Sequence, residues 1–244
     1  MSIPGLDSWL ETPQGRYVLH WEQSRLDAAL ADVFGFNALQ IGLSRRDFLR
    51  ANRIPLRAIL DDATPEDGLP LSIQTVFTHL PIAAQSVDLV VLPHVLEFYP
   101  EPHRILREVE RVLRPEGQLF ILGFNPRSLW GLFRRLSGRA RDFPWNGQYL
   151  SVPRLKDWLK LLGFELDRGA FGCYAPPCTR EKWLEHWRFL ELAGNRWWGF
   201  AGSVYMVRAI KRVCGMRLIV PTWNSPQIKA KALTPIVRKE HPDD

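Results

Sequence analysis

The sequence is poor in cysteine and in long apolar runs. Its three cysteines in 244 residues are an odd number and too few for a disulfide framework, so we expect reduced thiols. No stretch approaches the roughly 20 uncharged apolar residues that a membrane-spanning helix needs, and the first residues lack the basic and apolar regions of a secretory signal. These absences favour a cytoplasmic protein, either in solution or at the periphery of a membrane.

Several chemical signatures are also missing. No Gly-x-Gly-x-x-Gly run follows the first expected strand, which disfavours a dinucleotide-dependent dehydrogenase. Cys173 and Cys178 lack a second pair of ligands, so no zinc site is expected. No Ser-His-Asp or Cys-His hydrolase signature and no recognisable RNA-binding module is present. The chemistry must therefore come from other residues.

Charge is divided unevenly along the chain. Residues 1–126 hold 11 Lys and Arg against 16 Asp and Glu, whereas residues 127–244 hold 21 against 10. Seven of the ten tryptophans fall between positions 130 and 198. A basic half that is rich in aromatic residues suggests contact with nucleic acid, an anionic membrane or an acidic substrate, although core tryptophans beside a solvated basic face would give the same composition.

Apolar runs alternate with helical patterns through the first 126 residues. Helices are expected at 16–34, 45–51 and 102–113, and strands at 38–43, 57–60, 73–77, 87–92 and 118–123. The run at 87–92 is apolar without clean alternation, as in a strand buried on both faces of a parallel sheet. Strand-helix-strand units joined by short turns predict a parallel α/β sheet.

The second half predicts a looser arrangement. Leu129, Leu132, Phe133 and Leu136 recur at helical spacing beside arginines, which indicates a short basic amphipathic helix that could serve as a lid. Further helices are expected at 152–162 and 180–192, and strands at 164–166 and 203–210. We expect a helical extension at 1–37, a main domain at 38–213 with a basic lid-like insertion at 127–150, and an extended or disordered basic tail at 214–244.

Glycine and polar residues follow the first four expected strands. Ligands of open parallel sheets bind beyond the carboxyl ends of the strands, and an ionised carboxylate suits the vicinal hydroxyls of a ribose because it only accepts hydrogen bonds. A cofactor that contains a nucleoside is therefore predicted, although a plain turn would use the same residue types. The residues concerned are Gly42, Asp61, Asp62, Thr78, Pro93 and His94.

Two runs in the middle of the chain carry a family resemblance. They read Val-Asp-Leu-Val-Val-Leu-Pro-His-Val-Leu-Glu-Phe at 87–98 and Arg-Glu-Val-Glu-Arg-Val-Leu-Arg-Pro-Glu-Gly at 107–117. Together they resemble the class I S-adenosylmethionine-dependent methyltransferases, in particular the type 11 group that acts on small molecules, over roughly residues 39–166. The resemblance implies a three-layer Rossmann-like α/β fold, in which a mostly parallel seven-stranded sheet with an antiparallel last strand is flanked by helices.

The resemblance also implies a cofactor site for S-adenosylmethionine. The first loop of the family reads acid-x-Gly-x-Gly-x-Gly, whereas here Gln40 replaces the acid, Gly42 is kept, and Ser44 and Arg46 replace two glycines. Asp61, or Asp62 if the strand is one residue longer, matches the acid that binds the ribose, and His94 is the candidate general base. The cofactor-binding residues so implied are Gln40, Gly42, Ser44, Asp61, Asp62, Thr78, Leu80, Pro93 and His94, with no metal ligand.

Three functions remain open at this point. The first is an S-adenosylmethionine-dependent methyltransferase of a small or lipid-like acceptor, and the second is a methyltransferase fold that has lost catalysis and serves as a binding module. The third, which the sequence favours least, is an RNA methyltransferase. An anionic membrane or acidic substrate is expected to contact Arg127, Arg134, Arg135 and Arg139.

Overall fold

The computed structural model describes the greater part of the chain. The described residues are 5–63, 71–136, 144–177, 187, 191, 194 and 198–213. All of them belong to one compact unit, Met1–Val213, and a second unit comprises Cys214–Asp244. The expected tail at 214–244 and most of the expected helix at 180–192 lie outside the described residues.

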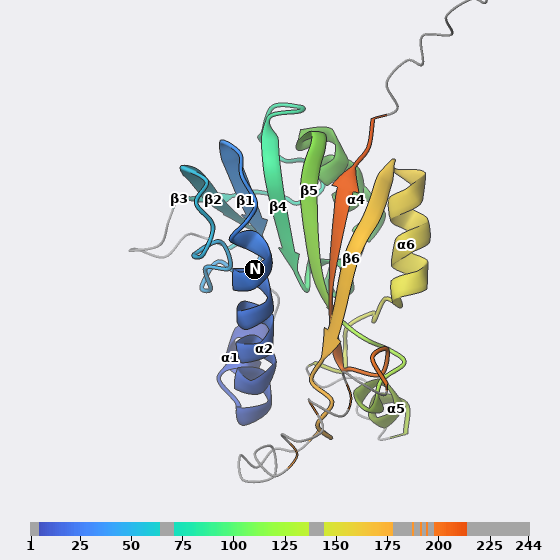
Figure 1. Ribbon diagram of the computed structural model, residues 1–244. Helices are drawn as coiled ribbons and strands as arrows, with labels where there is room; N and C mark the ends of the chain where they lie inside the picture. The colour runs from blue at the N-terminus through green and yellow to red at the C-terminus, as the bar shows by residue number, and fades with distance from the viewer. Residues whose placement is uncertain are drawn as a thin grey trace, which may run out of the picture. The chain divides into compact units, whose positions relative to one another are not determined.

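A seven-stranded sheet forms the centre of the first unit, with the strand order β3-β2-β1-β4-β5-β7-β6 (Figure 1). The strands β1 to β5 are parallel, whereas β7 is antiparallel to both β5 and β6. The implied mostly parallel sheet with a final antiparallel strand is therefore confirmed. The strands are β1 (Asn37–Ile41), β2 (Leu56–Asp61), β3 (Leu71–Gln74), β4 (Val87–Pro93), β5 (Leu113–Phe124), β6 (Phe164–Gly172) and β7 (Val204–Lys211).

Helices cover both faces of the sheet. The helices α1 (Leu6–Leu10) and α2 (Pro13–Leu30) pack on one face, and α4 (Pro102–Val112) and α6 (Val152–Leu161) pack on the other (Figure 1). The short helix α3 (Val95–Phe98) follows β4, and α5 (Leu129–Leu136) follows β5. The expected α/β architecture of three layers thus holds.

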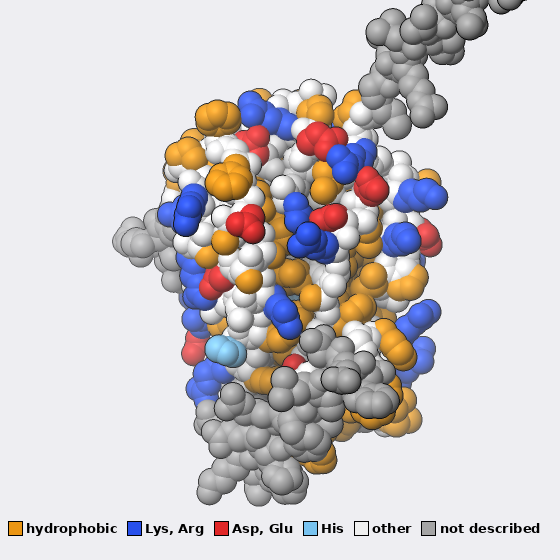
Figure 2. Space-filling model, viewed as in Figure 1, with side chains coloured by type: hydrophobic (Ala, Val, Ile, Leu, Met, Phe, Trp, Pro, Cys, Tyr) orange, Lys and Arg blue, Asp and Glu red, His pale blue; other side chains and the backbone are white. Residues whose placement is uncertain are grey.

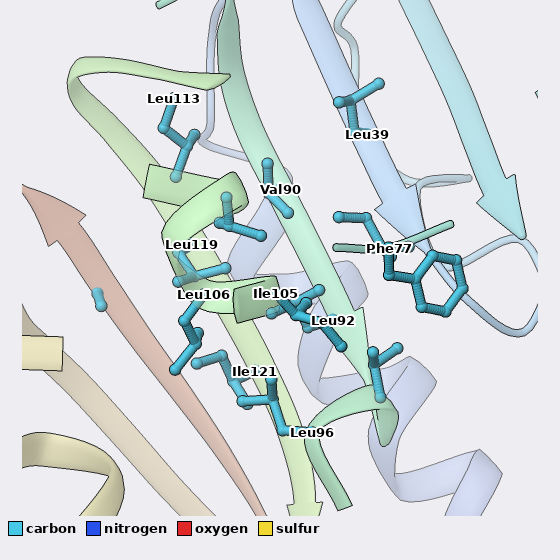
Figure 3. Packing of buried hydrophobic residues seen from close by; sticks show 14 of the residues in the cluster. Leu39, Phe77, Val90, Leu92, Leu96, Ile105, Leu106, Leu113, Leu119 and Ile121 are labelled. Carbon is cyan, nitrogen blue, oxygen red and sulfur yellow. The ribbon is translucent and has the colours of Figure 1, made fainter. Parts of the chain in front are cut away.

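Successive strand residues enter two separate cores, because neighbouring side chains of a strand point to opposite faces. In β4, Val90 and Leu92 join the core under α4, whereas Leu89 and Val91 join the core under α2. Figure 3 shows Val90 and Leu92 with the α4 residues Ile105 and Leu106 on the first of these faces. The central strands are buried on both faces, which explains their unbroken apolar sequence.

Several expected elements differ in extent or type, among them the strand predicted at 73–77, which forms at Leu71–Gln74, and the strand predicted at 164–166, which extends to Gly172. The helix predicted at 16–34 begins at Pro13, because Thr12 caps it by accepting a hydrogen bond from Gly15 N–H, and it ends at Leu30. The strand predicted at 118–123 extends from Leu113 to Phe124, and its pairing with β4 shifts register between Leu113 and Gln118. The helix predicted at 45–51 is wrong, since this segment forms turns.

Candidate functional site

The order of the strands places the candidate site between β1 and β4. Here the sheet reverses direction, since β2 and β3 lie on one side of β1 while β4 and β5 lie on the other. A crevice for ligands is expected beyond the carboxyl ends at such a point. The segments after β1, β2 and β4 therefore meet at one edge, as the sequence predicted.

Gln40 organises the loop that follows β1. Its side-chain Nε2 donates to the carbonyl oxygens of Gly42, Leu43 and Arg46, at 3.0, 3.0 and 2.7 Å, and its Oε1 accepts from the N–H of Phe48 at 2.9 Å. The side chain is fully buried. Gln40 thus satisfies backbone groups that a helix at 45–51 would have paired, which explains why that helix does not form.

Gly42 is held in the left-handed region with φ of 84°. A Cβ atom at this position would lie 2.8 Å from Cγ2 of Val95, so a larger residue would clash with the segment after β4 as well as strain the backbone. Its N–H donates to Leu60 O of β2 at 2.7 Å. Gly42 therefore brings the ends of β1, β2 and β4 into contact.

The two residues that replace glycines in this loop point to different partners. Arg46 forms an ion pair with Glu11, which follows α1. Ser44 is buried and donates its backbone N–H to Asp61 Oδ2 at 2.9 Å. The guanidinium of Arg46 is thus held by the N-terminal segment.

Asp61 and Asp62 differ in what their carboxylates bind. Besides Ser44 N–H, the Asp61 carboxylate accepts from the N–H of Asp62 at 2.8 Å, and it is only 3% exposed. Asp62 is half-buried. Burial, and after it the carboxylates of Asp62 and Asp61, raise the pKa of Tyr99. The chain's own loop therefore engages Asp61, whereas Asp62 lies beside an aromatic hydroxyl.

The predicted residues after β3 do not join this group through their side chains. The Thr78 hydroxyl lies 3.0 Å from His79 Nδ1 and is exposed, and Leu80 is part of the apolar core. Instead Phe77, which the sequence reasoning missed, packs near the Cβ position of Gly42 and contacts the Tyr99 ring in a tilted arrangement, with ring centroids 4.7 Å apart. Its buried ring lies beyond the arrowhead of β1 in Figure 3.

His94 lies immediately after β4 in a left-handed conformation with φ of 56°. The preceding residue, Pro93, is buried and pairs with Leu122 of β5. The His94 ring is fully buried: Nε2 lies 2.7 Å from Glu22 Oε1, and Nδ1 lies 3.0 Å from Glu97 Oε2. Both ring nitrogens are engaged, so His94 presents neither of them to an acceptor in this geometry. The role of general base stays a prediction, and this geometry argues against it.

The two glutamates come from different helices. Glu22 is a buried residue of α2, and its Oε2 has no hydrogen-bond partner among the described residues. Glu97 belongs to α3, and its Oε1 accepts from the N–H of Phe124 in β5 at 2.5 Å. We call Glu22, His94 and Glu97 the buried triad. It links α2 to the carboxyl ends of β4 and β5.

The triad shifts the acid-base equilibria of its members. Burial lowers the pKa of His94, but the charges and hydrogen bonds of Glu22 and Glu97 outweigh it and raise the pKa to about 10. Burial raises the pKa of Glu97 to about 6, against the opposing effect of His94. The raised pKa of His94 therefore favours its protonated form beside the two glutamates.

The sequence reasoning missed Glu22, although a signal for it exists. Glu22 follows Val18 by four residues and precedes Leu26 by four, so it occupies the apolar stripe of α2, and all three side chains are buried. A lone carboxylate within such a stripe predicts a buried polar partner. The identity of that partner could not be read from the sequence.

The four arginines predicted to meet an anion differ in their surroundings. Arg127 and Arg135 are exposed. Arg134 donates to the carbonyl oxygens of Trp145 and Gly147 at 2.5 and 2.7 Å, and its guanidinium lies 4.8 Å from the Tyr149 ring centroid. Arg139 lies outside the described residues. The prediction that Arg134 contacts an anion needs correction, because its guanidinium donates hydrogen bonds to backbone carbonyl groups of this chain.

The described residues contain neither a metal-binding cluster nor a membrane-spanning helix. No group of three or more His, Cys, Asp and Glu among them is arranged to hold a metal ion. Within the same residues, no helix is both long enough and apolar enough to cross a bilayer.

Comparisons with known proteins agree with this architecture. A family model described as a methyltransferase domain, type 11, matches residues 55–121, which run from β2 into β5. This middle part of the chain is therefore similar in sequence to a methyltransferase domain. A solved S-adenosylmethionine-dependent methyltransferase of Thermotoga maritima shares the fold, with a TM-score of 0.62 and 16% identity over 84% of this chain and 94% of that one.

Two curated proteins are similar to this chain in sequence. The uncharacterized protein YafS of Escherichia coli is 34% identical over 66% of this chain and 65% of its own length. A demethylmenaquinone methyltransferase of Lactobacillus johnsonii is 30% identical over 36% of this chain and 43% of its own length. The chain thus covers less than two thirds of either relative.

Proposed function

We propose that this chain transfers a methyl group from S-adenosylmethionine to a small, lipid-like acceptor. The observation that supports the proposal best is the convergence of Gly42, Asp62 and the segment after β4 at the reversal point of a methyltransferase sheet. The residues of the loop after β1 fit the cofactor, because the two large polar side chains there bind other groups of the protein. Gln40 binds backbone carbonyl groups of the loop, and Arg46 pairs with Glu11. Gly42 lets the loop after β1 approach the segment after β4, because a Cβ at this position would lie 2.8 Å from Val95 Cγ2.

Asp62 is the residue that we assign to the cofactor ribose. Backbone N–H groups already occupy the Asp61 carboxylate, and only 3% of that residue is exposed. Asp62 follows β2 directly and is half-buried beside Tyr99, and a carboxylate has several lone pairs with which to accept from ribose hydroxyls as well as from the Tyr99 hydroxyl. Asp61 then acts on the loop after β1, by fixing Ser44.

Methyl transfer from a sulfonium is an in-line displacement in which the cofactor supplies an already activated methyl group. The protein has to align the acceptor and exclude water. In this proposal the buried triad holds α2 across the ends of β4 and β5, and His94 is a positioning residue. An acceptor that must lose a proton would then pass it to another group.

A second candidate function is a binding module without catalysis. The observation that favours it is that Gln40 and Asp61 satisfy the loop after β1 internally, and Phe77 packs near Gly42. Calorimetry distinguishes the two functions. Heat on addition of S-adenosylmethionine or S-adenosylhomocysteine supports the enzyme, whereas no heat at millimolar ligand with folded protein supports the binding module.

The Asp62→Ala variant tests the ribose assignment. We expect it to weaken the binding of S-adenosylhomocysteine by about 1.5–3 kcal/mol, the contribution of hydrogen bonds to a charged acceptor. Asp32→Ala, which removes an exposed carboxylate near the other end of the sheet, should leave the affinity unchanged. Loss of binding in Asp61→Ala but not in Asp62→Ala, with both variants folded, would contradict the assignment.

The name of one relative suggests a first methyl acceptor to test. Demethylmenaquinone, the compound in the name of one relative, is a first acceptor to assay with radiolabelled S-adenosylmethionine. Transfer of label into the organic phase would identify a lipid-like acceptor. Label in an aqueous small molecule, with none in the lipid extract, would contradict the lipid-like class while leaving methyl transfer intact.

A further inference from the structure

The helix α5 turns its apolar stripe outward. Leu129, Leu132, Phe133 and Leu136, at spacings of three and four residues, are 51%, 51%, 36% and 77% exposed. The opposite side holds the fully buried Trp130, whose Nε1 donates to Ala175 O at 2.8 Å. A surface helix normally buries its apolar stripe. In α5 that stripe instead faces solvent.

Two exposed aromatic residues belong to a loop that contacts the segment before α5. Trp198 is 57% exposed and Phe200 is 67% exposed. Asn125, which precedes α5, donates from Nδ2 to Phe200 O at 2.8 Å, so this loop and the helix are joined. We call the set Leu129, Leu132, Phe133, Leu136, Trp198 and Phe200 the α5 surface. In Figure 2, apolar side chains gather at the lower right, where Figure 1 places α5.

Positive charge borders this apolar set. Arg127 and Arg135 are exposed, and residues 125–136 contain no Asp or Glu. The chain from 127 onward carries 21 Lys and Arg against 10 Asp and Glu. Arg134 is not available to an anionic partner, because it donates hydrogen bonds to the carbonyl groups of Trp145 and Gly147. Leucines, aromatic residues and arginines without acids are typical of helices that lie at an anionic lipid surface.

We propose that the α5 surface docks this protein onto an anionic lipid bilayer. The apolar side chains enter the boundary between headgroups and acyl chains, while Arg127 and Arg135 meet lipid phosphates. The surface follows β5 at the carboxyl edge of the sheet, the same edge that holds Gly42 and the buried triad. Docking therefore brings the candidate site close to the bilayer.

Vesicle flotation with the full chain tests the proposal without any cofactor. The probes are vesicles of phosphatidylcholine alone and of phosphatidylcholine with 30% phosphatidylglycerol. We expect binding to the anionic vesicles that decreases when salt is raised, because salt screens exposed charges. Calorimetry with S-adenosylhomocysteine on the same sample separates a failure of docking from a failure of the proposed methyl transfer.

Two double variants address the apolar and the charged parts. Leu132→Ser with Leu136→Ser should lower binding to anionic vesicles roughly tenfold or more, through the lost burial of two leucines. Arg127→Glu with Arg135→Glu should lower it roughly tenfold or more, because each basic residue near the surface contributes about a fivefold change. Both pairs are exposed, so the fold should be retained, and circular dichroism checks this.

Matched controls are available at exposed positions outside the α5 surface. Phe34→Ser with Phe36→Ser removes apolar residues that are 74% and 68% exposed, and Arg53→Glu with Arg168→Glu makes the same change in charge elsewhere. These controls should bind vesicles as the unmodified protein does. No binding to anionic vesicles, or an equal loss in the controls, would overturn the proposal. Salt-sensitive RNA binding that disappears with the arginine reversals, without vesicle binding, would also overturn it.

Discussion

A single carboxylate on α2 has a large influence on the site. Glu22 is fully buried, and one of its oxygens lies 2.7 Å from His94 Nε2. Placing a charge in the interior is costly unless it is paired, and breaking such a pair leaves the partner charge unsatisfied. Glu22 and His94 therefore depend on one another for their place in the core.

At this residue we expect Glu22→Ala to lower the free energy of unfolding by about 3–5 kcal/mol, the cost of removing one partner from a buried ion pair. Asp27 provides a control in the same helix, because it pairs with Arg50 at an exposed position. Asp27→Ala should lower the same free energy by about 1 kcal/mol at most. Urea denaturation followed by circular dichroism measures both, and equal effects of the two changes would refute a special role for Glu22.

The helix α2 is the element that carries Glu22 to the sheet, and its first turn is held by Thr12. The Thr12 hydroxyl donates to Trp9 O at 2.6 Å and accepts from Gly15 N–H at 3.1 Å, so it also joins α1 to α2. Pro13 occupies the first helical position, where its missing N–H costs nothing. The start of α2 is thus set by local chemistry.

For this element, Thr12→Ala should lower the free energy of unfolding by about 1 kcal/mol, since an N-cap side chain satisfies an otherwise unpaired helical N–H. Ser8→Ala is the matched control, because the Ser8 hydroxyl donates to Gly5 O at an exposed position. We expect the control to change stability by less than about 0.5 kcal/mol. Thermal denaturation would show whether the two variants differ, and indistinguishable curves would argue against the cap.

Across the whole molecule, the N-terminal helices and the sheet share one core. Leu6, Leu10 and Leu26 pack in the same cluster as Leu89 and Phe120 of the sheet. The buried triad lies at the carboxyl end of this assembly and contributes charge to its interior. The stability of the entire fold should therefore depend on pH through these groups.

The direction of that dependence follows from His94. Its pKa rises from an ordinary 6.5 to about 10 in the folded protein, so its stabilising effect is complete below about pH 6.5 and is lost as pH rises through 10. We expect the free energy of unfolding to decrease between pH 7 and 10. Glu22→Gln removes the charge that raises this pKa and should flatten the decrease. Urea titrations at several pH values compare the two proteins, and parallel pH profiles would contradict the assignment.

Glu97 makes the stability depend on pH over a second, narrower pH range. Its pKa rises from 4.5 to about 6 on folding, so the stabilisation that it contributes is complete below about pH 4.5 and is lost as pH rises through 6. Both groups therefore act in the same direction.

Much of the fold could be predicted from the sequence because the relevant signals are local. The apolar run of β4, the spacing of Ile105, Leu106 and Val109, and the Pro115-Glu116-Gly117 break located β4, α4 and β5 in the right order. The loop after β1 was not predictable in the same way. A helix was predicted at 45–51, but Gln40 and Asp61 bind the backbone groups of that loop from positions outside it.

The sequence alone determined the order of the strands and helices, the α/β class and the edge at which polar residues gather, because periodicity and chain breakers act over a few residues. Only the tertiary structure decided what each polar group binds. Glu22 and His94 are 72 residues apart, and their contact depends on how α2 lies on the sheet. The orientation of α5 was also decided by tertiary packing, because Trp130 is buried in the core whereas the leucine stripe is exposed. Such choices depend on which surfaces meet, and no local pattern records them.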